Sequence, residues 1–156
     1  MLFSTGRERR RHEESFRRQV VSKRWTLSEC FNAFGAVGSN PRWSWSARSS
    51  DGGTVVITLW KDRIVFKDGT VFYEDVKIDT EAWRDRPGNR ERIANLIWAR
   101  EHCNGFFKTV ITIAKDERRQ PREIRECFPK PEYNMRILSL NEGTGEFVAC
   151  HQHLAK

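Results

Sequence analysis

Arginines are the residues of this sequence best suited to contact a ligand, and two groups of them beyond the N-terminal segment are candidate contacts. Arg42 and Arg48 lie in a stretch with strand-like alternation. A polar segment further along carries four more within eight residues: Arg118, Arg119, Arg122 and Arg125. A guanidinium group forms paired hydrogen bonds with phosphate and with the edge of guanine. Both groups of arginines therefore predict a nucleic-acid contact, with solvated surface charge as the alternative.

The four arginines of the polar segment repel one another, and an anion bound among them would relieve that repulsion. Pro121 stiffens the middle of the run. Internal neutralisation is the alternative, since three glutamates lie nearby: Glu117, Glu123 and Glu126. We expect Arg122, beside the proline, to act as a base reader or clamp, and Arg118 and Arg119 to contact phosphate.

Trp43 and Trp45 alternate with polar and basic residues in the first stretch. A strand here places the indoles on one face and hydroxyl and guanidinium groups on the other. Indole rings stack on nucleobases, but large aromatic side chains more often fill a core. We expect both tryptophans to be mainly structural. Base stacking remains the alternative, so both stay among the candidate DNA-binding residues.

A catalytic signal is present at Asp75-Val76-Lys77, which resembles the last half of an acidic-x-Lys motif of metal-dependent nucleases. The earlier acidic partner belongs on a neighbouring strand, whereas Asp62 and Asp68 are expected in turns. The sequence contains no His-Asn-His motif, Gly-rich phosphate loop or Gly-x-Ser-x-Gly elbow. We assign no catalytic residue and keep a small metal-dependent nuclease as an alternative function.

Zinc-ligand residue types occur at His102-Cys103 and at Cys150-His151-Gln152-His153, with Cys127 as a third contributor. Their spacing matches no recurrent zinc site. Adjacent histidine and cysteine side chains also point in opposite directions on a strand. We therefore expect no metal site and no cofactor.

Composition indicates a globular protein of one domain. The chain has 156 residues, 38% of them hydrophobic, with ten Phe and six Trp, which excludes a disordered polar chain. A net charge of +7 suits a polyanionic partner such as nucleic acid. The four cysteines form no Cys-x-x-Cys pair, and neither a signal peptide nor an apolar run of about 20 residues is found. We expect free thiols, a cytoplasmic location and no membrane association.

The first 24 residues are predicted to form a basic N-terminal arm, and residues 25–156 a single α+β domain. Residues 7–24 carry eight basic and three acidic side chains, hence +5 of the net +7. Glu13 and Glu14 each precede an arginine by four residues, which favours a helix. The arm is either a solvated helix or a segment that lies along phosphate.

The first half of the domain is predicted to form a short helix followed by two hairpins. Thr26-Leu27-Ser28-Glu29 is a capping box, and Gly35 and Gly38 end the helix. Asp51-Gly52-Gly53 and Asp68-Gly69 are hairpin turns between alternating segments, up to residue 78. Two successive hairpins predict an antiparallel meander.

In the second half, Asn89 is the expected N-cap of a helix from Arg90 to about Cys103. Its buried face would carry Ile93, Leu96, Ile97 and Arg100. A central strand at 106–114, a long polar connection at 115–134 and a last hairpin at 135–140 and 146–151 follow. Together these elements predict an α+β fold. We expect six or seven strands in a mostly antiparallel, strongly twisted or barrel-like sheet, with one main helix packed on it and a basic helical arm.

Several motifs together resemble a known family. The run Arg42-Trp43-Ser44-Trp45-Ser46-Ala47, with Asp51-Gly52 and Leu59-Trp60-Lys61-Asp62, resembles the DNA-recognition domain that precedes the nuclease in modification-dependent HNH restriction endonucleases. The resemblance covers residues 40–150 and continues through Glu91-Arg92, Asn95-Leu96-Ile97, Ile113-Ala114-Lys115-Asp116, Pro121-Arg122-Glu123-Ile124 and Gly145-Glu146-Phe147.

This resemblance implies a bacterial, cytoplasmic protein that binds double-stranded DNA and senses a modified base within a restriction or defence system. The sequence departs from the family because it lacks an HNH module. We therefore expect a non-catalytic reader that works alone, with a nuclease module or subunit, or as a fragment of a larger nuclease. A protein-interaction module of a defence system is a third interpretation.

Overall fold

The computed structural model describes residues 6–7, 9–11, 24–40, 43–75, 85–119 and 121–152. Residues 6–7 and 9–11 are helical, and two further helices, one short 3₁₀ turn and eight strands follow in the described part of the chain. Their bounds are α2 Leu27–Asn32, β1 Ala36–Val37, β2 Ser46–Ser49, β3 Val55–Trp60, η1 Lys61–Arg63, β4 Ile64–Lys67, β5 Thr70–Asp75, α3 Pro87–His102, β6 Phe106–Ala114, β7 Ile124–Leu140 and β8 Phe147–Gln152. Most of the predicted N-terminal arm lies outside the described residues.

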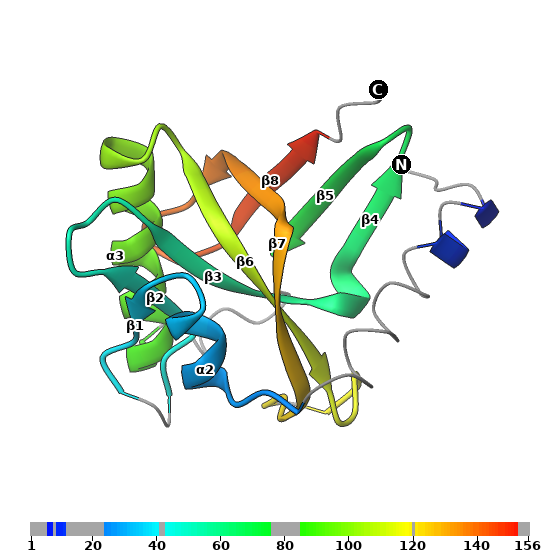
Figure 1. The fold of residues 1–156 in the computed structure, drawn as a ribbon, viewed down its shortest axis with the longest axis horizontal. Helices are drawn as coiled ribbons and strands as arrows, with labels where there is room; N and C mark the ends of the chain where they lie inside the picture. Colours follow the sequence, from blue (N-terminus) through cyan, green and yellow to red (C-terminus); the bar gives the residue numbers. More distant parts are fainter. Residues whose placement is uncertain are drawn as a thin grey trace.

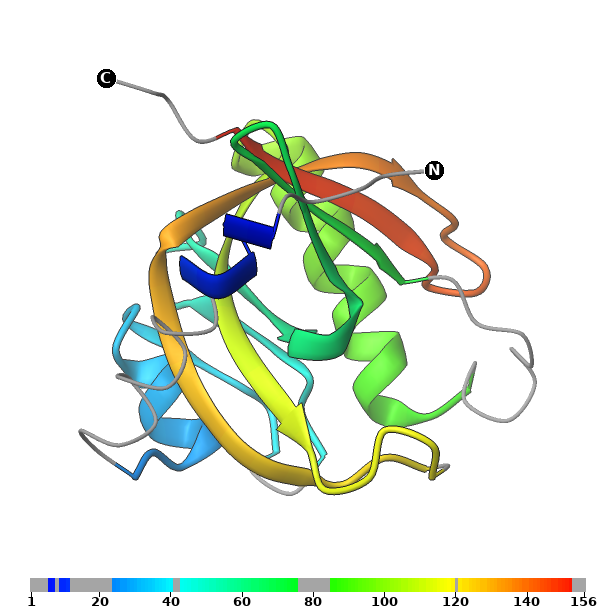
Figure 2. The same cartoon turned by 90° about the vertical axis from the view of Figure 1, so that its right-hand side faces the viewer.

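All eight strands belong to one curved sheet, in the order β1-β2-β3-β6-β7-β8-β5-β4 (Figures 1 and 2). The α+β prediction is confirmed, but the described sheet has eight strands instead of the six or seven expected, and two further details are wrong. The sheet is open, because β1 and β4 at its two edges do not pair. It is also mixed, because β3 and β6 run parallel while the other pairs are antiparallel.

The predicted hairpins form, but the predicted meander does not. β2 pairs with β3 across the turn at Asp51-Gly52-Gly53, and β4 pairs with β5 across Asp68 and Gly69, both at positive φ. After Trp60 the chain leaves β3 through η1, and β3 and β4 are not neighbours in the sheet. Parallel strands need a crossover connection, and here residues 61–105, which include α3, provide it.

The predicted connection at 115–134 is much shorter in the structure, because β7 already begins at Ile124. Pro129 and Pro131 misled the prediction, since prolines disfavour central strands. Among the described strands, β8 pairs with β7 only from Arg136 onward, so the proline segment has a strand neighbour on one side only. A register shift between Lys108 and Thr109 absorbs three further residues of β7.

Helix α3 starts earlier than predicted, with Pro87 in its first turn and no side-chain cap at Arg86. Its buried side is also different from the predicted apolar face. Leu96 and Ala99 are buried, but so are three polar residues: Asn89, Arg92 and Asn95. Of the predicted face, only Leu96 is buried, because Ile93 and Ile97 are half-buried and Arg100 is exposed.

The two helices cover opposite faces of the sheet (Figure 2). Leu96 of α3 packs in the larger core cluster with Val55, Ile57 and Leu59 of β3. Val56, on the other side of that strand, packs with Cys30 and Phe31 of α2 in the second cluster. The capping box of α2 is present as predicted, with Thr26 and Glu29 exchanging hydrogen bonds.

Both tyrosines of the chain are buried, which predicts a sensitivity to alkali. Burial raises the pKa of Tyr73 and of Tyr133 above the ordinary value of about 10, and Asp75 adds to the rise for Tyr73. The unfolded chain therefore ionises first, so stability is full below pH about 10 and falls above it. The expected slope is about 1.4 kcal/mol per pH unit for each tyrosine.

Tyrosinate absorbance and circular dichroism, followed together during an alkaline titration, test this expectation. The two signals should change at the same pH. In concentrated urea, as the control, tyrosinate should appear with an ordinary midpoint of about 10. Ionisation near pH 10 with the circular dichroism unchanged would show that the hydroxyls are accessible.

Candidate nucleic-acid interface

A pocket of about 520 Å³ opens where β6 ends and β7 begins. Its walls come from η1, the end of β6, the loop residues 115–118 and the start of β7. Four basic and three acidic residues are among its lining: Lys61, Asp62, Ile113, Ala114, Lys115, Asp116, Glu117, Arg118 and Arg125. The pocket therefore brings together two of the predicted arginines with basic residues that the sequence interpretation did not select.

The loop beside this pocket is closed by its own backbone. The amide of Lys115 donates to the carbonyl of Glu123 at 2.9 Å, and the Lys115 ammonium lies 3.3 Å from the Glu123 carboxylate. Asp116 accepts from the amide of Arg118 at 3.0 Å through its side chain and from that of Arg119 at 3.3 Å through its carbonyl. These contacts give the loop a defined shape.

Arg122 ties the loop to η1. Its two terminal nitrogens donate to the two carboxylate oxygens of Asp62 at 2.6 and 2.7 Å, and one of them also donates to the carbonyl of Glu117 at 3.0 Å. The guanidinium lies 5.1 Å from the centre of the Trp60 ring. Hydrogen bonding to Asp62 raises the pKa of Arg122. A bidentate pair of this kind is strong and directional.

Because Asp62 accepts from both terminal nitrogens, Arg122 holds the loop in place, and its Nε is buried without a hydrogen-bond partner. Its side chain is only 9% exposed. The expected role of base reader or clamp concerned DNA, whereas the contacts of Arg122 in the structure lie within the protein.

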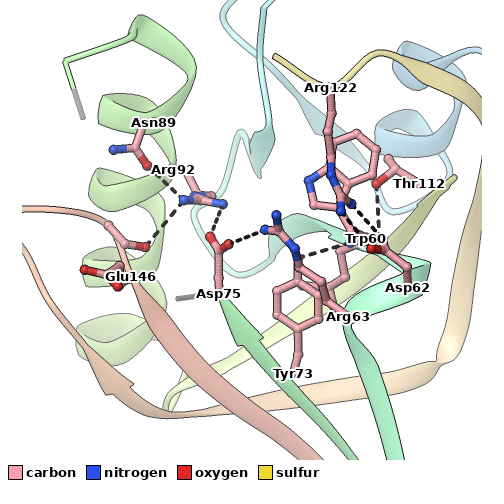
Figure 3. Close-up of polar contacts among 12 residues, drawn as sticks. Trp60, Asp62, Arg63, Tyr73, Asp75, Asn89, Arg92, Thr112, Arg122 and Glu146 are labelled. Carbon is pink, nitrogen blue, oxygen red and sulfur yellow. Dashed lines mark hydrogen bonds and ion pairs between the residues drawn. The ribbon is translucent and has the colours of Figure 1, made fainter. Parts of the chain in front are cut away.

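A second carboxylate, Asp75, lies beside Arg63, next to the Arg122–Asp62 pair (Figure 3). Its side chain is fully buried and lies between two arginines, 3.0 Å from Arg63 of η1 and 2.7 Å from Arg92 of α3. Arg92 also donates to the side chain of Asn89 at 2.9 Å. The backbone amide of Trp60 donates to the hydroxyl of Tyr73 at 3.1 Å. Through Arg63 and Asp62, neighbours in η1, this network joins α3 and β5 to the arginine loop.

Three of the predicted arginines point to solvent. Arg118, Arg119 and Arg125 are exposed, and within the described residues their side chains form no ion pair. The glutamates expected to neutralise the run do so only in part, because Glu123 pairs with Lys115. The loop thus combines fixed geometry with unneutralised positive charge.

The predicted residues of the first stretch lie elsewhere, against α3. The Arg48 guanidinium stacks 4.2 Å from the centre of the Trp98 ring and donates to Asn95 at 3.1 Å. The Trp45 ring lies 5.4 Å from the Arg92 guanidinium, and a β-carbon at Gly88 would stand 2.8 Å from it. The expected structural role of Trp45 is thus supported by its packing.

Trp43, like Trp45, is half-buried rather than part of the core. The predicted separation of faces is wrong for the neighbouring serines, because Ser44 and Ser46 are buried. Ser46 accepts from the Asn95 side chain at 2.8 Å, so this polar face meets the polar side of α3. Arg42 lies outside the described residues. Of the other predicted residues, Trp45 and Arg48 lie against α3, whereas Arg118 and Arg125 line the pocket.

The catalytic and metal alternatives find little support in the geometry. Asp75 is buried between two arginines, whereas a metal ligand needs carboxylate oxygens open to the ion. Lys77 lies outside the described residues. In the part of the chain that the structure describes, no three His, Cys, Asp or Glu side chains lie close enough to hold a metal together.

Comparisons of this chain with protein-family models, with curated proteins and with solved structures found no match. Among the described helices, none has the length and apolar character needed to cross a membrane.

Proposed function

We propose that this chain is a non-catalytic domain that binds double-stranded DNA. The pocket at the end of β6 and its arginine rim, formed by Arg118, Arg119 and Arg125, contact phosphate in this proposal. The observation that carries the proposal is the combination of exposed, unpaired Arg118, Arg119 and Arg125 with a loop held by the Arg122–Asp62 pair. Because the loop backbone is already held by these contacts, it does not have to be ordered when an anion arrives, which favours binding.

Phosphate fits this surface better than a stacked base does. None of the nine residues that line the pocket has an aromatic ring, and single-stranded bases are usually held on aromatic side chains. Phosphate contacts position a protein on DNA and supply affinity without reading sequence. The basic arm at 1–24 is expected to add to this affinity through its excess charge.

The resemblance to modification-dependent restriction endonucleases extends the proposal. On that basis the chain recognises a modified base as part of a bacterial restriction or defence system, with cleavage supplied by a nuclease module or subunit. The described tryptophans give this part no support, since Trp45 is packed against α3.

Binding of a labelled duplex, measured by fluorescence anisotropy at several salt concentrations, tests the proposal. We expect the logarithm of the affinity to fall linearly with the logarithm of the salt concentration, with a slope of about −0.9 for each phosphate contact. A chain that lacks residues 1–24 should bind every sequence more weakly and show a flatter slope. An unchanged slope would mean that the charge of the arm does not take part.

The same titration should include methylated, hydroxymethylated and unmodified duplexes, and an RNA duplex. Preference for one modified duplex supports modified-base recognition, and equal affinity for all DNA duplexes restricts the function to phosphate binding. Tighter binding of RNA, or no salt-dependent binding at all, would contradict the proposal. Nicking of plasmid DNA in the presence of Mg²⁺ or Mn²⁺ would replace it with the nuclease alternative.

A further inference from the structure

Two cysteines from distant parts of the chain meet between α2 and β7. The sulfurs of Cys30 and Cys127 are 3.7 Å apart, although 97 positions separate the residues. Both belong to the second core cluster, where Cys30 is fully buried and Cys127 is 7% exposed. The other two cysteines lie elsewhere: Cys103 follows the end of α3, and Cys150 lies on β8.

The contact is close enough for a covalent bond with small movements. A disulfide has a sulfur–sulfur distance of about 2.05 Å. Starting from 3.7 Å, each sulfur has to move by less than about 1 Å to reach that distance. The two cysteines are thus placed to pair with each other before either pairs with a different thiol of the chain.

We propose that Cys30 and Cys127 form a reversible disulfide site that fastens α2 to the start of β7. The proposal does not depend on DNA binding, although Cys127 lies only two residues beyond Arg125, which lines the basic pocket. A bond here closes a long loop of the chain. It fixes the short helix, held otherwise by few buried side chains, to the longest strand of the sheet.

The local chemistry favours Cys127 as the attacking residue. Cys30 donates a hydrogen bond to the Cys127 sulfur, and this bond lowers the pKa of Cys127, while burial and Glu29 act in the opposite direction. The thiolate is the reactive form of cysteine. Cys127 is also the more accessible of the pair.

Formation of this bond needs an acceptor for two electrons, and a disulfide such as oxidised glutathione can serve as that oxidant. The Cys127 thiolate attacks one sulfur of the oxidant, a mixed disulfide forms, and one glutathione thiolate leaves. Cys30 loses its proton and attacks the Cys127 sulfur, which expels the second glutathione thiolate. Two electrons pass from the two cysteines to the oxidant, and the two protons released by the cysteines are taken up by two glutathione thiolates.

Access to this site requires a local opening of α2. The helix has six residues and buries only Cys30 and Phe31, so it belongs to the part of the fold that opens at low free-energy cost. Formation of the bond should therefore be slower than modification of the half-buried Cys103 and Cys150, but it should be favoured at equilibrium.

The test uses the full chain carrying Cys103→Ser and Cys150→Ser, incubated with a mixture of oxidised and reduced glutathione. After acid quenching, unfolding and alkylation, mass spectrometry should show the loss of two hydrogens and no alkylated cysteine. The melting temperature should rise by on the order of 10 °C and return to its original value after reduction.

Adding Cys30→Ala to this variant provides the matched control. It should accumulate a glutathione adduct on Cys127 and show no rise in melting temperature. Peptide mapping of the oxidised wild-type chain gives an independent readout, since a crosslinked peptide should contain Cys30 and Cys127. Alkylation of both cysteines after oxidation, or glutathione adducts without a crosslink, would overturn the proposal.

Discussion

Replacing Asp75 by alanine is expected to lower the free energy of unfolding by about 3–5 kcal/mol. The Asp75 carboxylate is fully buried and binds Arg63 at 3.0 Å and Arg92 at 2.7 Å. Arg92 is itself only 4% exposed. Without the carboxylate, its guanidinium remains buried with less compensating charge, and this desolvation cost dominates the effect. Chemical denaturation of wild-type and Asp75→Ala proteins measures it directly.

Asp85→Ala is the matched control for this prediction. Asp85 also pairs with an arginine, since it lies 3.1 Å from Arg90, but the two side chains are 78% and 69% exposed. Exposed pairs contribute about 0–1 kcal/mol, so this substitution should change stability very little. A loss at Asp75 no larger than that at Asp85 would mean that the buried network does not stabilise the fold.

Local sequence signals predicted the elements whose causes are local. The capping box at Thr26 and Glu29 formed as expected, because both hydrogen bonds lie within one turn of helix. The hairpin turn at Asp68 and Gly69 formed because these residues tolerate positive φ. The apolar run at 106–114 became the central strand β6 for a similar reason, since its composition requires burial on both faces.

These local signals do not predict which strands pair with each other in the sheet. Alternation shows that a segment is a strand, but it does not show which strand lies beside it. The parallel pair of β3 and β6 depends on the crossover that includes α3, and nothing in either strand encodes that crossover. The prolines of β7 gave a misleading signal, because a strand with one neighbour tolerates a missing donor.

The candidate site was predicted only in part, for the same physical reason. The arginine run marked the loop, since clustered like charges are a local feature. The pairing of Arg122 with Asp62 joins residues 60 positions apart, so no local pattern predicts it. The polar residues of α3 are buried because β2 lies against them and supplies hydrogen-bond partners such as Ser46. A periodicity that includes Asn89, Arg92, Leu96 and Ala99 would have indicated the correct helix face.

Reversing the charge of two rim arginines should have the largest effect on DNA binding. In the double variant Arg118→Glu and Arg125→Glu, both phosphate contacts are lost and two negative charges enter the pocket that these residues line. Charge-assisted hydrogen bonds contribute about 1.5 kcal/mol or more each, so affinity should fall by roughly 100-fold. The salt slope should flatten by about 2 units, one for each contact. Both residues are exposed, so the melting temperature should stay close to that of the wild type.

The control is the double variant Arg100→Glu and Arg136→Glu, which changes the net charge by the same amount at the opposite end of β6. Arg136 pairs with Phe106 at the start of that strand, whereas the pocket includes Ile113 and Ala114 at its end. A nine-residue strand separates the two places by roughly 27 Å. If net charge alone attracts DNA, the two double variants lose affinity equally, and the pocket has no special role. A loss confined to the Arg118 and Arg125 variant assigns binding to the loop that the Arg122–Asp62 pair holds in place.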